Sequence, residues 1–121
     1  LPAQPERKVV YCIWKDPWMT VSPDTYIARM LEEIGWRCWT VPGSQLRYPS
    51  FEWSEAGHAV DAVLLSTEPY RFREADAAAL QAELGKPVML VDGEMLSWYG
   101  SRAVQGLRYL RKLATSWPSD G

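Results

Sequence analysis

The chain has 121 residues, of which 47% are hydrophobic and 23% are charged, and its formal net charge is −2. This length and composition are typical of one globular domain with a single core, and they exclude two independent domains. A slightly acidic chain lacks the basic excess of nucleic-acid-binding proteins, so we expect no nucleic-acid partner. No apolar run approaches the roughly 20 residues that cross a bilayer, and the first residues do not form a signal peptide.

The beginning of the sequence is typical of a linker, because it contains Pro2 and Pro5, no initiator Met and no apolar pattern. We therefore expect residues 1–6 to be a linker remnant, residues 7–117 to form a single α/β lobe and residues 118–121 to be a tail. The sequence is expected to be a fragment, or a chain whose leader has been removed.

The first predicted strand is residues 8–14, a continuous run of β-branched and aromatic side chains that is typical of a strand buried on both faces. A helix is predicted next. Ser22 is its expected N-cap, Pro23 its first residue and Asp24 an acid of its first turn, and Gly35 ends it.

Strands and helices alternate through the rest of the chain. The predicted elements are a strand at residues 37–41, a loop at 42–49, a short helix at 52–58, a strand at 62–66, a helix at 73–84 that ends at Gly85, a strand at 87–91 and a helix at 101–116. This alternation predicts a three-layer α/β sandwich with right-handed crossovers. Its central sheet would be mainly parallel, with four or five strands, as in a Rossmann-like lobe.

Cys12 and Cys38 both lie in apolar, strand-like runs. A free cysteine in such a run most often serves as a small hydrophobic side chain. A disulfide between them stays open as an alternative if their strands are neighbours. Two cysteines without CxxC spacing give no metal signature.

Three loops leave the carboxyl ends of predicted strands, at residues 15–21, 67–72 and 92–102. In open α/β sheets such loops carry the ligand contacts, and the most informative of them is residues 92–102. These loops and the end of the first strand contain many aromatic and charged residues, namely Trp14, Trp18, Tyr70, Phe72, Trp98, Tyr99, Asp16, Glu68, Asp92, Glu94, Arg71 and Arg102. Flat aromatic faces with a few polar groups suit a large, partly apolar ligand such as a macrocycle or a chelate. The alternative is that some of these aromatic side chains only pack the loops.

Three motifs in order carry a resemblance to a known family: IWKDPWMT at residues 13–20, LSTEPYRF at 65–72 and DGEMLSWYGSR at 92–102. Together they resemble the C-terminal lobe of bacterial periplasmic substrate-binding proteins with a helical backbone between two lobes. Those proteins serve ABC importers of cobalamin, haem and iron siderophores. The resemblance implies a corrinoid, haem or siderophore ligand, an ABC transporter permease as partner, a missing N-terminal lobe and a periplasmic location.

The resemblance also implies roles for single residues. In this family the ligand lies between the lobes and contacts the loops at the strand ends. The resemblance therefore implies ligand contacts at Trp14, Asp16, Trp18, Tyr70, Glu94 and Trp98, and at Arg47 and Tyr48 in the loop after the second strand. An exposed glutamate near the start of the short helix docks on arginines of the permease in this family. Here we favour Glu55 over Glu52, and the alternative for both is a solvated surface charge.

Other chemistries fit the sequence less well. A receiver domain needs an acid at the end of its third strand, where this chain has Ser66 and Thr67. Hydrolysis by a serine nucleophile is disfavoured, because the single histidine, His58, lies in the short helix and no GxSxG motif is present. Paired carboxylates, Glu68 with Asp92 or Glu94, could support acid–base chemistry or bind a divalent ion.

We therefore expect a binding protein and no enzyme, with no cofactor and no metal site of its own. The alternative is an independent flavodoxin-like enzyme or sensor domain that binds a small ligand at the same edge of the sheet. Seven tryptophans make an exposed apolar patch plausible, and we expect a homodimer of the isolated lobe.

Overall fold

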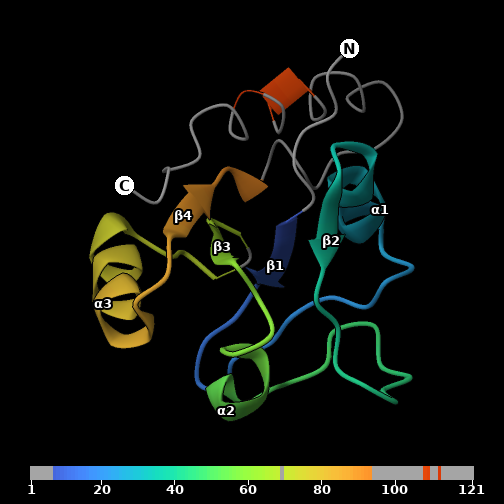
Figure 1. Cartoon of the computed structure of the whole chain (residues 1–121), viewed down its shortest axis with the longest axis horizontal. Coiled ribbons are helices and arrows are strands. Elements are labelled where there is room, and N and C mark those ends of the chain that lie inside the picture. Colours follow the sequence, from blue (N-terminus) through green and yellow to red (C-terminus); the bar gives the residue numbers. More distant parts are fainter. Residues whose placement is uncertain (1–6, 69, 94–107, 110–111, 113–121) are drawn as a thin grey trace.

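A parallel sheet of four strands forms the centre of the fold (Figure 1). The computed structural model describes residues 7–68, 70–93, 108, 109 and 112. The strands are β1 (Arg7–Cys12), β2 (Trp36–Cys38), β3 (Ala62–Ser66) and β4 (Val88–Val91), in the spatial order β2-β1-β3-β4. The predicted α/β class and parallel sheet are therefore confirmed.

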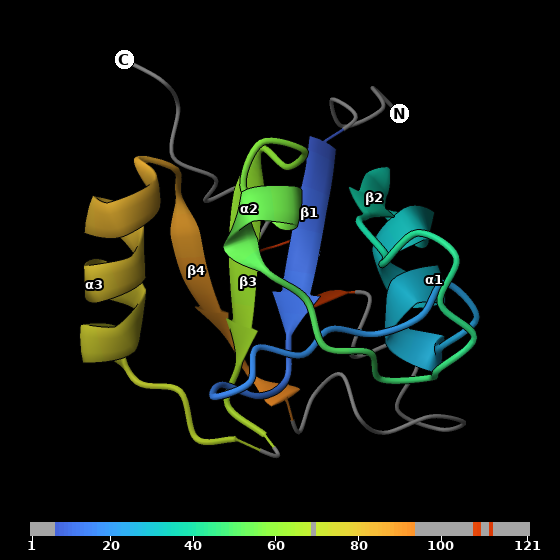
Figure 2. The same ribbon diagram turned by 90° about the horizontal axis from the view of Figure 1, so that it is seen from below.

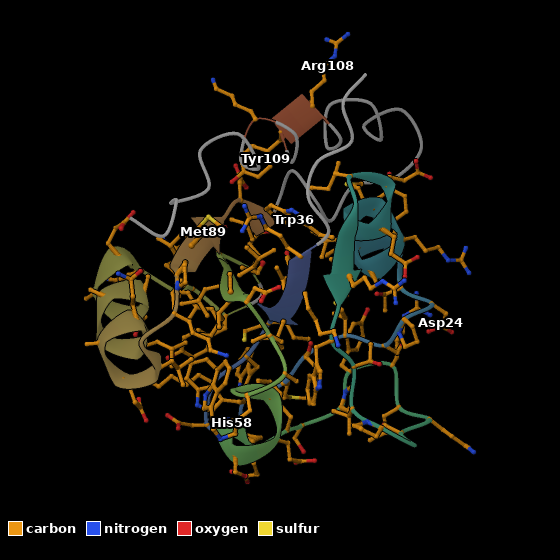
Figure 3. All side chains as sticks on the ribbon, viewed as in Figure 1. Asp24, Trp36, His58, Met89, Arg108 and Tyr109 are labelled. Atoms are coloured by element: carbon orange, nitrogen blue, oxygen red, sulfur yellow. The ribbon has the colours of Figure 1, made fainter. Side chains whose placement is uncertain are left out.

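Helices cover both faces of this sheet, which gives three layers. The helices are α1 (Tyr26–Glu33), α2 (Trp53–Ala56) and α3 (Glu74–Leu84). Val9 and Tyr11 of β1 pack with α1 and with Tyr109 on one face, whereas Val10 and Cys12 pack with α2 and α3 on the other. Figure 2 shows α2 in front of the sheet and the segment with Tyr109 behind it. Figure 3 labels Tyr109, Trp36 and Met89, which all belong to the cluster on the α1 face of the sheet.

The strand register brings the carboxyl ends of β1, β3 and β4 to one edge of the sheet. Cys12 of β1 pairs with Leu65 of β3, and Ser66 of β3 pairs with Val91 of β4. The chain leaves β1 toward β2 on one side and leaves β3 toward β4 on the other. The edge between β1 and β3 is thus the topological switch point, where open α/β sheets form a crevice for ligands.

The start of α1 differs from the prediction. Its N-cap is Thr25, whose Oγ1 accepts a hydrogen bond from the backbone N of Ala28 at 3.3 Å. The Thr25 hydroxyl donates to the backbone O of Ser22 at 2.8 Å, and the Ser22 hydroxyl donates to the Asp24 carboxylate. Ser22, Pro23 and Asp24 therefore form the turn before the helix. The expected N-cap at Ser22 was wrong, because Thr25 is the residue whose side-chain oxygen accepts from a free N–H of the first turn, that of Ala28.

The bounds of other elements also differ from the predicted ones. β2 ends at Cys38, not at residue 41; the N–H of Trp39 donates to Val9 O at 2.6 Å, and the chain then turns through Gly43 at φ +74°. The short helix is limited to Trp53–Ala56. Of the predicted helix at residues 101–116, Arg108, Tyr109 and Lys112 are helical and the other residues lie outside the described part of the chain.

The two cysteines lie on opposite faces of the sheet and are free. Cys12 packs in the cluster with α2 and α3, whereas Cys38 packs against the cluster with α1. Burial raises the pKa of the Cys38 thiol to about 12 and raises that of Cys12 well above its usual value. A disulfide between them is excluded, and both behave as small hydrophobic side chains.

Candidate functional site

The loop after β1 is a tight hairpin at the switch point. Backbone hydrogen bonds join Ile13 N to Met19 O at 3.0 Å and Met19 N to Trp14 O at 3.1 Å. Asp16 at the tip has φ +58°, and its peptide bond to Pro17 is cis. Met19 also forms an antiparallel bridge with Ser50 on its other side. The hairpin is therefore fixed between β1 and the segment that leads into α2.

Two aromatic side chains meet where β1 and β3 end. The rings of Trp14 and Tyr70 are 5.3 Å apart between centroids and cross at 76°, an edge-to-face contact. Trp14 keeps 40% of its surface exposed, and Tyr70 is half-buried with its ring 4.5 Å from that of Phe72. We call Trp14 and Tyr70 the aromatic rim. The structure brings these two predicted contacts together from loops more than fifty residues apart in the sequence.

Trp18 has a different environment from Trp14. Its ring stacks on Phe72 at 5.7 Å and meets the edge of Trp53 at 5.1 Å, and the side chain is half-buried. The ammonium of Lys15 lies 6.0 Å from the centre of the Trp18 ring, within cation–π range. Both rings join the loops to the core; Phe72 is buried, whereas the half-buried Trp18 keeps part of its surface open at this edge.

The acids of this edge are exposed. Asp16 lies at the tip of the hairpin, and Glu68 lies in the turn after β3. The Ser66 hydroxyl holds that turn, because Oγ donates to Glu68 O at 2.5 Å and accepts from Glu68 N at 3.2 Å. Asp92 is exposed at the end of β4. Within the described residues, no three His, Cys, Asp or Glu side chains are grouped so that they could hold a metal ion.

The loop after β2 continues the same edge. Ser22 N donates to Arg47 O at 2.8 Å, which places this loop beside the segment that follows the hairpin. The Arg47 guanidinium lies 6.0 Å from the centre of the Tyr48 ring. Tyr48 and Leu46 are exposed at 47% and 65%, and a cavity of about 430 Å³ lies between this loop and the turn at Ser22. Leu46 was not predicted, although an apolar residue in a polar loop is a signal that could have identified it.

The predicted contacts Glu94 and Trp98 lie outside the described residues. The beginning of their loop is described, and two backbone hydrogen bonds fix it. Asp92 N donates to the hydroxyl of Tyr109 at 2.8 Å, and Gly93 N donates to Thr67 Oγ1 at 3.0 Å. The loop after β4 therefore starts beside the loop that carries Tyr70.

The two candidate docking residues lie on α2. Glu55 is inside this helix and Glu52 is its N-cap residue, and both side chains are exposed. Phe51, just before α2, donates its N–H to Trp18 O at 3.0 Å, so the start of this helix is joined to the edge described above. His58 is exposed after α2 (Figure 3).

No protein-family model and no curated protein matches the sequence. Solved structures do match. A structure described as a possible iron-binding periplasmic solute-binding protein from Staphylococcus epidermidis is 18% identical, with a TM-score of 0.72, over 89% of this chain and 45% of that one. The chain has the fold of half a solute-binding protein.

Two further structures show the same relationship. The periplasmic vitamin B12-binding protein of Vibrio cholerae is 16% identical with a TM-score of 0.62, over 93% of this chain and 47% of that one. An ABC transporter substrate-binding protein from Listeria monocytogenes is 12% identical with a TM-score of 0.63, over 89% and 47%. The chain thus spans about half the length of these solute-binding proteins. At such identities the similarity concerns the fold, and residue roles require a separate argument.

None of the described helices is long and apolar enough to cross a membrane.

Proposed function

We propose that the chain is the C-terminal lobe of a periplasmic solute-binding protein that captures a metal chelate or corrinoid and delivers it to an ABC importer. The candidate ligands are cobalamin, haem and iron siderophores. The observation that carries the proposal is the aromatic rim, in which exposed Trp14 meets Tyr70 at the switch point of a fold shared with solute-binding proteins. Two of the similar solved structures, one described as a possible iron-binding protein and one as a vitamin B12-binding protein, support this class of ligand.

The hairpin makes the rim suitable for a large, flat ligand. The Trp14 backbone O accepts a hydrogen bond from Met19 N, and the Trp14 ring contacts the Tyr70 ring before any ligand arrives. Binding a ligand to a side chain that is already fixed costs less conformational entropy than ordering a mobile one. Asp16, at the tip, provides a polar group beside the apolar ring, which would orient the ligand.

The remaining contacts belong to the same proposal. Trp18, Arg47, Tyr48, Glu94 and Trp98 would add to the wall of a cleft whose other side comes from an N-terminal lobe. No bond is made or broken during capture, so this lobe would act as a binding protein without a cofactor.

Binding measurements test the proposal on two forms of the protein. Calorimetry with cyanocobalamin, haemin and ferric siderophores should give submicromolar affinity for one ligand with the full-length, two-lobed protein. The isolated chain should bind at least tenfold more weakly, because about half of the contacts are missing and each 1.4 kcal/mol changes affinity about tenfold. Trp14→Ala should weaken binding by the two-lobed protein, whereas Trp39→Phe, in the packed cluster with Phe51, serves as the control.

A second candidate is an independent flavodoxin-like enzyme or sensor domain. The strand order β2-β1-β3-β4 favours it, since doubly wound domains of that type share this order and bind ligands at the same switch point. Submicromolar binding of a small ligand by the isolated chain would support this candidate and contradict the two-lobed proposal.

A further inference from the structure

The loops after β3 and β4 approach each other at one glycine. Gly93 is buried, and its N–H donates to Thr67 Oγ1 at 3.0 Å. A Cβ at Gly93 would collide with Ser66 Oγ, would lie 2.9 Å from the backbone N of Glu68 and would lie 3.1 Å from the Glu68 Cβ. Any side chain at this position therefore has to push the turn after β3 away.

Close approach is the reason for a glycine here, and backbone conformation is not. Gly43 and Gly85 have φ of +74° and +68°, and a Cβ would have open space at both. Gly93 has no positive φ, so alanine could adopt its backbone conformation. The requirement at Gly93 is therefore purely steric.

The turn that Gly93 touches also leads to the aromatic rim. Ser66 Oγ bonds both the N and the O of Glu68, so the turn behaves as one fixed unit. Tyr70 follows two residues later and contacts Trp14 at 5.3 Å and Phe72 at 4.5 Å. Because Glu68 and Tyr70 are two residues apart in one short loop, we expect a displacement at Glu68 to move Tyr70 as well.

We propose that Gly93 is a positioning residue of the ligand-binding edge. Its missing side chain lets the β3 turn dock against the end of β4, and this docking sets where Tyr70 meets Trp14. The effect on ligand affinity rests on the function proposed above, whereas the effect on the geometry of the rim does not.

The geometry can be tested on the chain without a ligand. The chemical shift of the Trp14 indole N–H in a ¹⁵N–¹H NMR spectrum depends on the nearby Tyr70 ring. The Tyr70→Leu variant shows where this signal appears when the ring contact is lost. Gly93→Ala should shift the Trp14 signal toward that position and leave the signal of Trp36, buried on the other face, unchanged. Gly43→Ala is the matched control, because it strains the backbone without touching the turn.

Two further variants keep the test decisive. Thr67→Val removes only the oxygen that accepts from Gly93 N, and it should shift the Trp14 signal in the same direction even if Gly93→Ala fails to fold. Thr67→Ser keeps the accepting oxygen and should leave the Trp14 signal at the wild-type position. Trp14 signals that stay at the wild-type position in folded Gly93→Ala or in Thr67→Val would overturn the proposal.

Ligand binding by the full-length protein separates the two proposals. We expect Gly93→Ala to weaken binding about tenfold, or about 1.4 kcal/mol. Equal affinities of wild type and variant would overturn the positioning role and leave the proposed function standing. A shifted Trp14 signal in a protein that binds none of the candidate ligands would support the positioning role of Gly93 and contradict the proposed function.

Discussion

Lys86 joins the turn after α2 to the beginning of β4. Its ammonium donates to the backbone O of Val60 at 2.6 Å and to that of Gly57. Both carbonyls lie beyond the end of α2, where backbone oxygens lack helical partners. This one side chain therefore connects the α2 layer to the sheet.

We predict that Lys86→Met, which keeps the apolar stem, lowers the free energy of unfolding by about 1.5 to 3 kcal/mol, the range for hydrogen bonds to charged groups. Urea denaturation measures this change. Arg29→Met, at an exposed position of α1, is the control and should stay within about 0.5 kcal/mol of wild type. Equal effects of the two variants would contradict a special role for Lys86.

Glu55 is the residue at which the proposed docking on a permease can be tested. Its side chain is exposed on α2, where an interfacial charge would be available to a partner. In the full-length protein, Glu55→Arg should leave ligand affinity nearly unchanged and weaken complex formation with the transporter by roughly 1 to 3 kcal/mol.

Glu52→Arg is the matched comparison and should have a smaller effect. Titration of the permease at low and high salt would measure both variants, because charge-assisted association depends on ionic strength. Normal transport by both variants would remove the docking role from this helix.

Trp14 and Trp18 have environments that could not be distinguished from the sequence. The family resemblance implied ligand contacts at both, since Trp14 ends the first predicted strand and Trp18 lies in the loop that follows it. The structure separates them, since Trp18 packs on Phe72 and Trp53 while Trp14 stays exposed beside Tyr70. Those partners come from distant parts of the sequence, so no local pattern distinguishes the two tryptophans.

At the scale of elements, the cap of α1 gives a stability prediction. Thr25→Ala removes the acceptor for Ala28 N and the donor to Ser22 O. We expect a loss of about 1 kcal/mol in the free energy of unfolding, as is typical of N-cap substitutions. Thermal or urea unfolding measures it, and Thr25→Ser should recover most of the loss. A similar loss in Ser22→Ala, with none in Thr25→Ala, would place the cap at Ser22 after all.

Elements defined by burial were predicted best. The strand at residues 62–66 agrees with β3 at both ends, because a run that is buried on both faces is apolar throughout. The helix that ends at Gly85 was also predicted, since Gly85 provides the left-handed residue that terminates α3. The start of α1 depends on which of two nearby hydroxyls, Ser22 or Thr25, caps the helix, and the end of β2 is followed by a hydrogen bond to the distant Val9 O. Composition does not encode either choice.

At the scale of the whole molecule, self-association of the isolated chain stays a prediction. Trp14, Leu46 and Tyr48 are exposed large hydrophobic side chains along one edge of the fold. Apolar surface of this kind promotes association when no partner covers it. Light scattering at increasing concentration should detect dimers, and the double change Trp14→Asp with Leu46→Asp should return the chain to a monomer. A wild-type chain that stays monomeric at high concentration would contradict the prediction.

The class of ligand could be proposed from the sequence, but the individual ligand could not. The chain matches only about half the length of the solute-binding proteins it resembles. Affinity and selectivity of a cleft depend on how both walls fit the ligand, and one wall of aromatic side chains suits several chelates equally. The fold could be predicted from this sequence, because the described strands and helices bury their apolar side chains against one another.

The placement of Cys12 and Cys38 on opposite faces of the sheet gives the protein two internal reporters of local opening. Cys12 is buried and Cys38 is half-buried, and the thiols have raised pKa values, so we expect each to react with an alkylating reagent faster when its own layer separates from the sheet. Labelling of Cys38 records departures of α1, and labelling of Cys12 records departures of α2 and α3. The two labelling rates, measured in one sample, would therefore rank the two helical layers by how often each leaves the sheet.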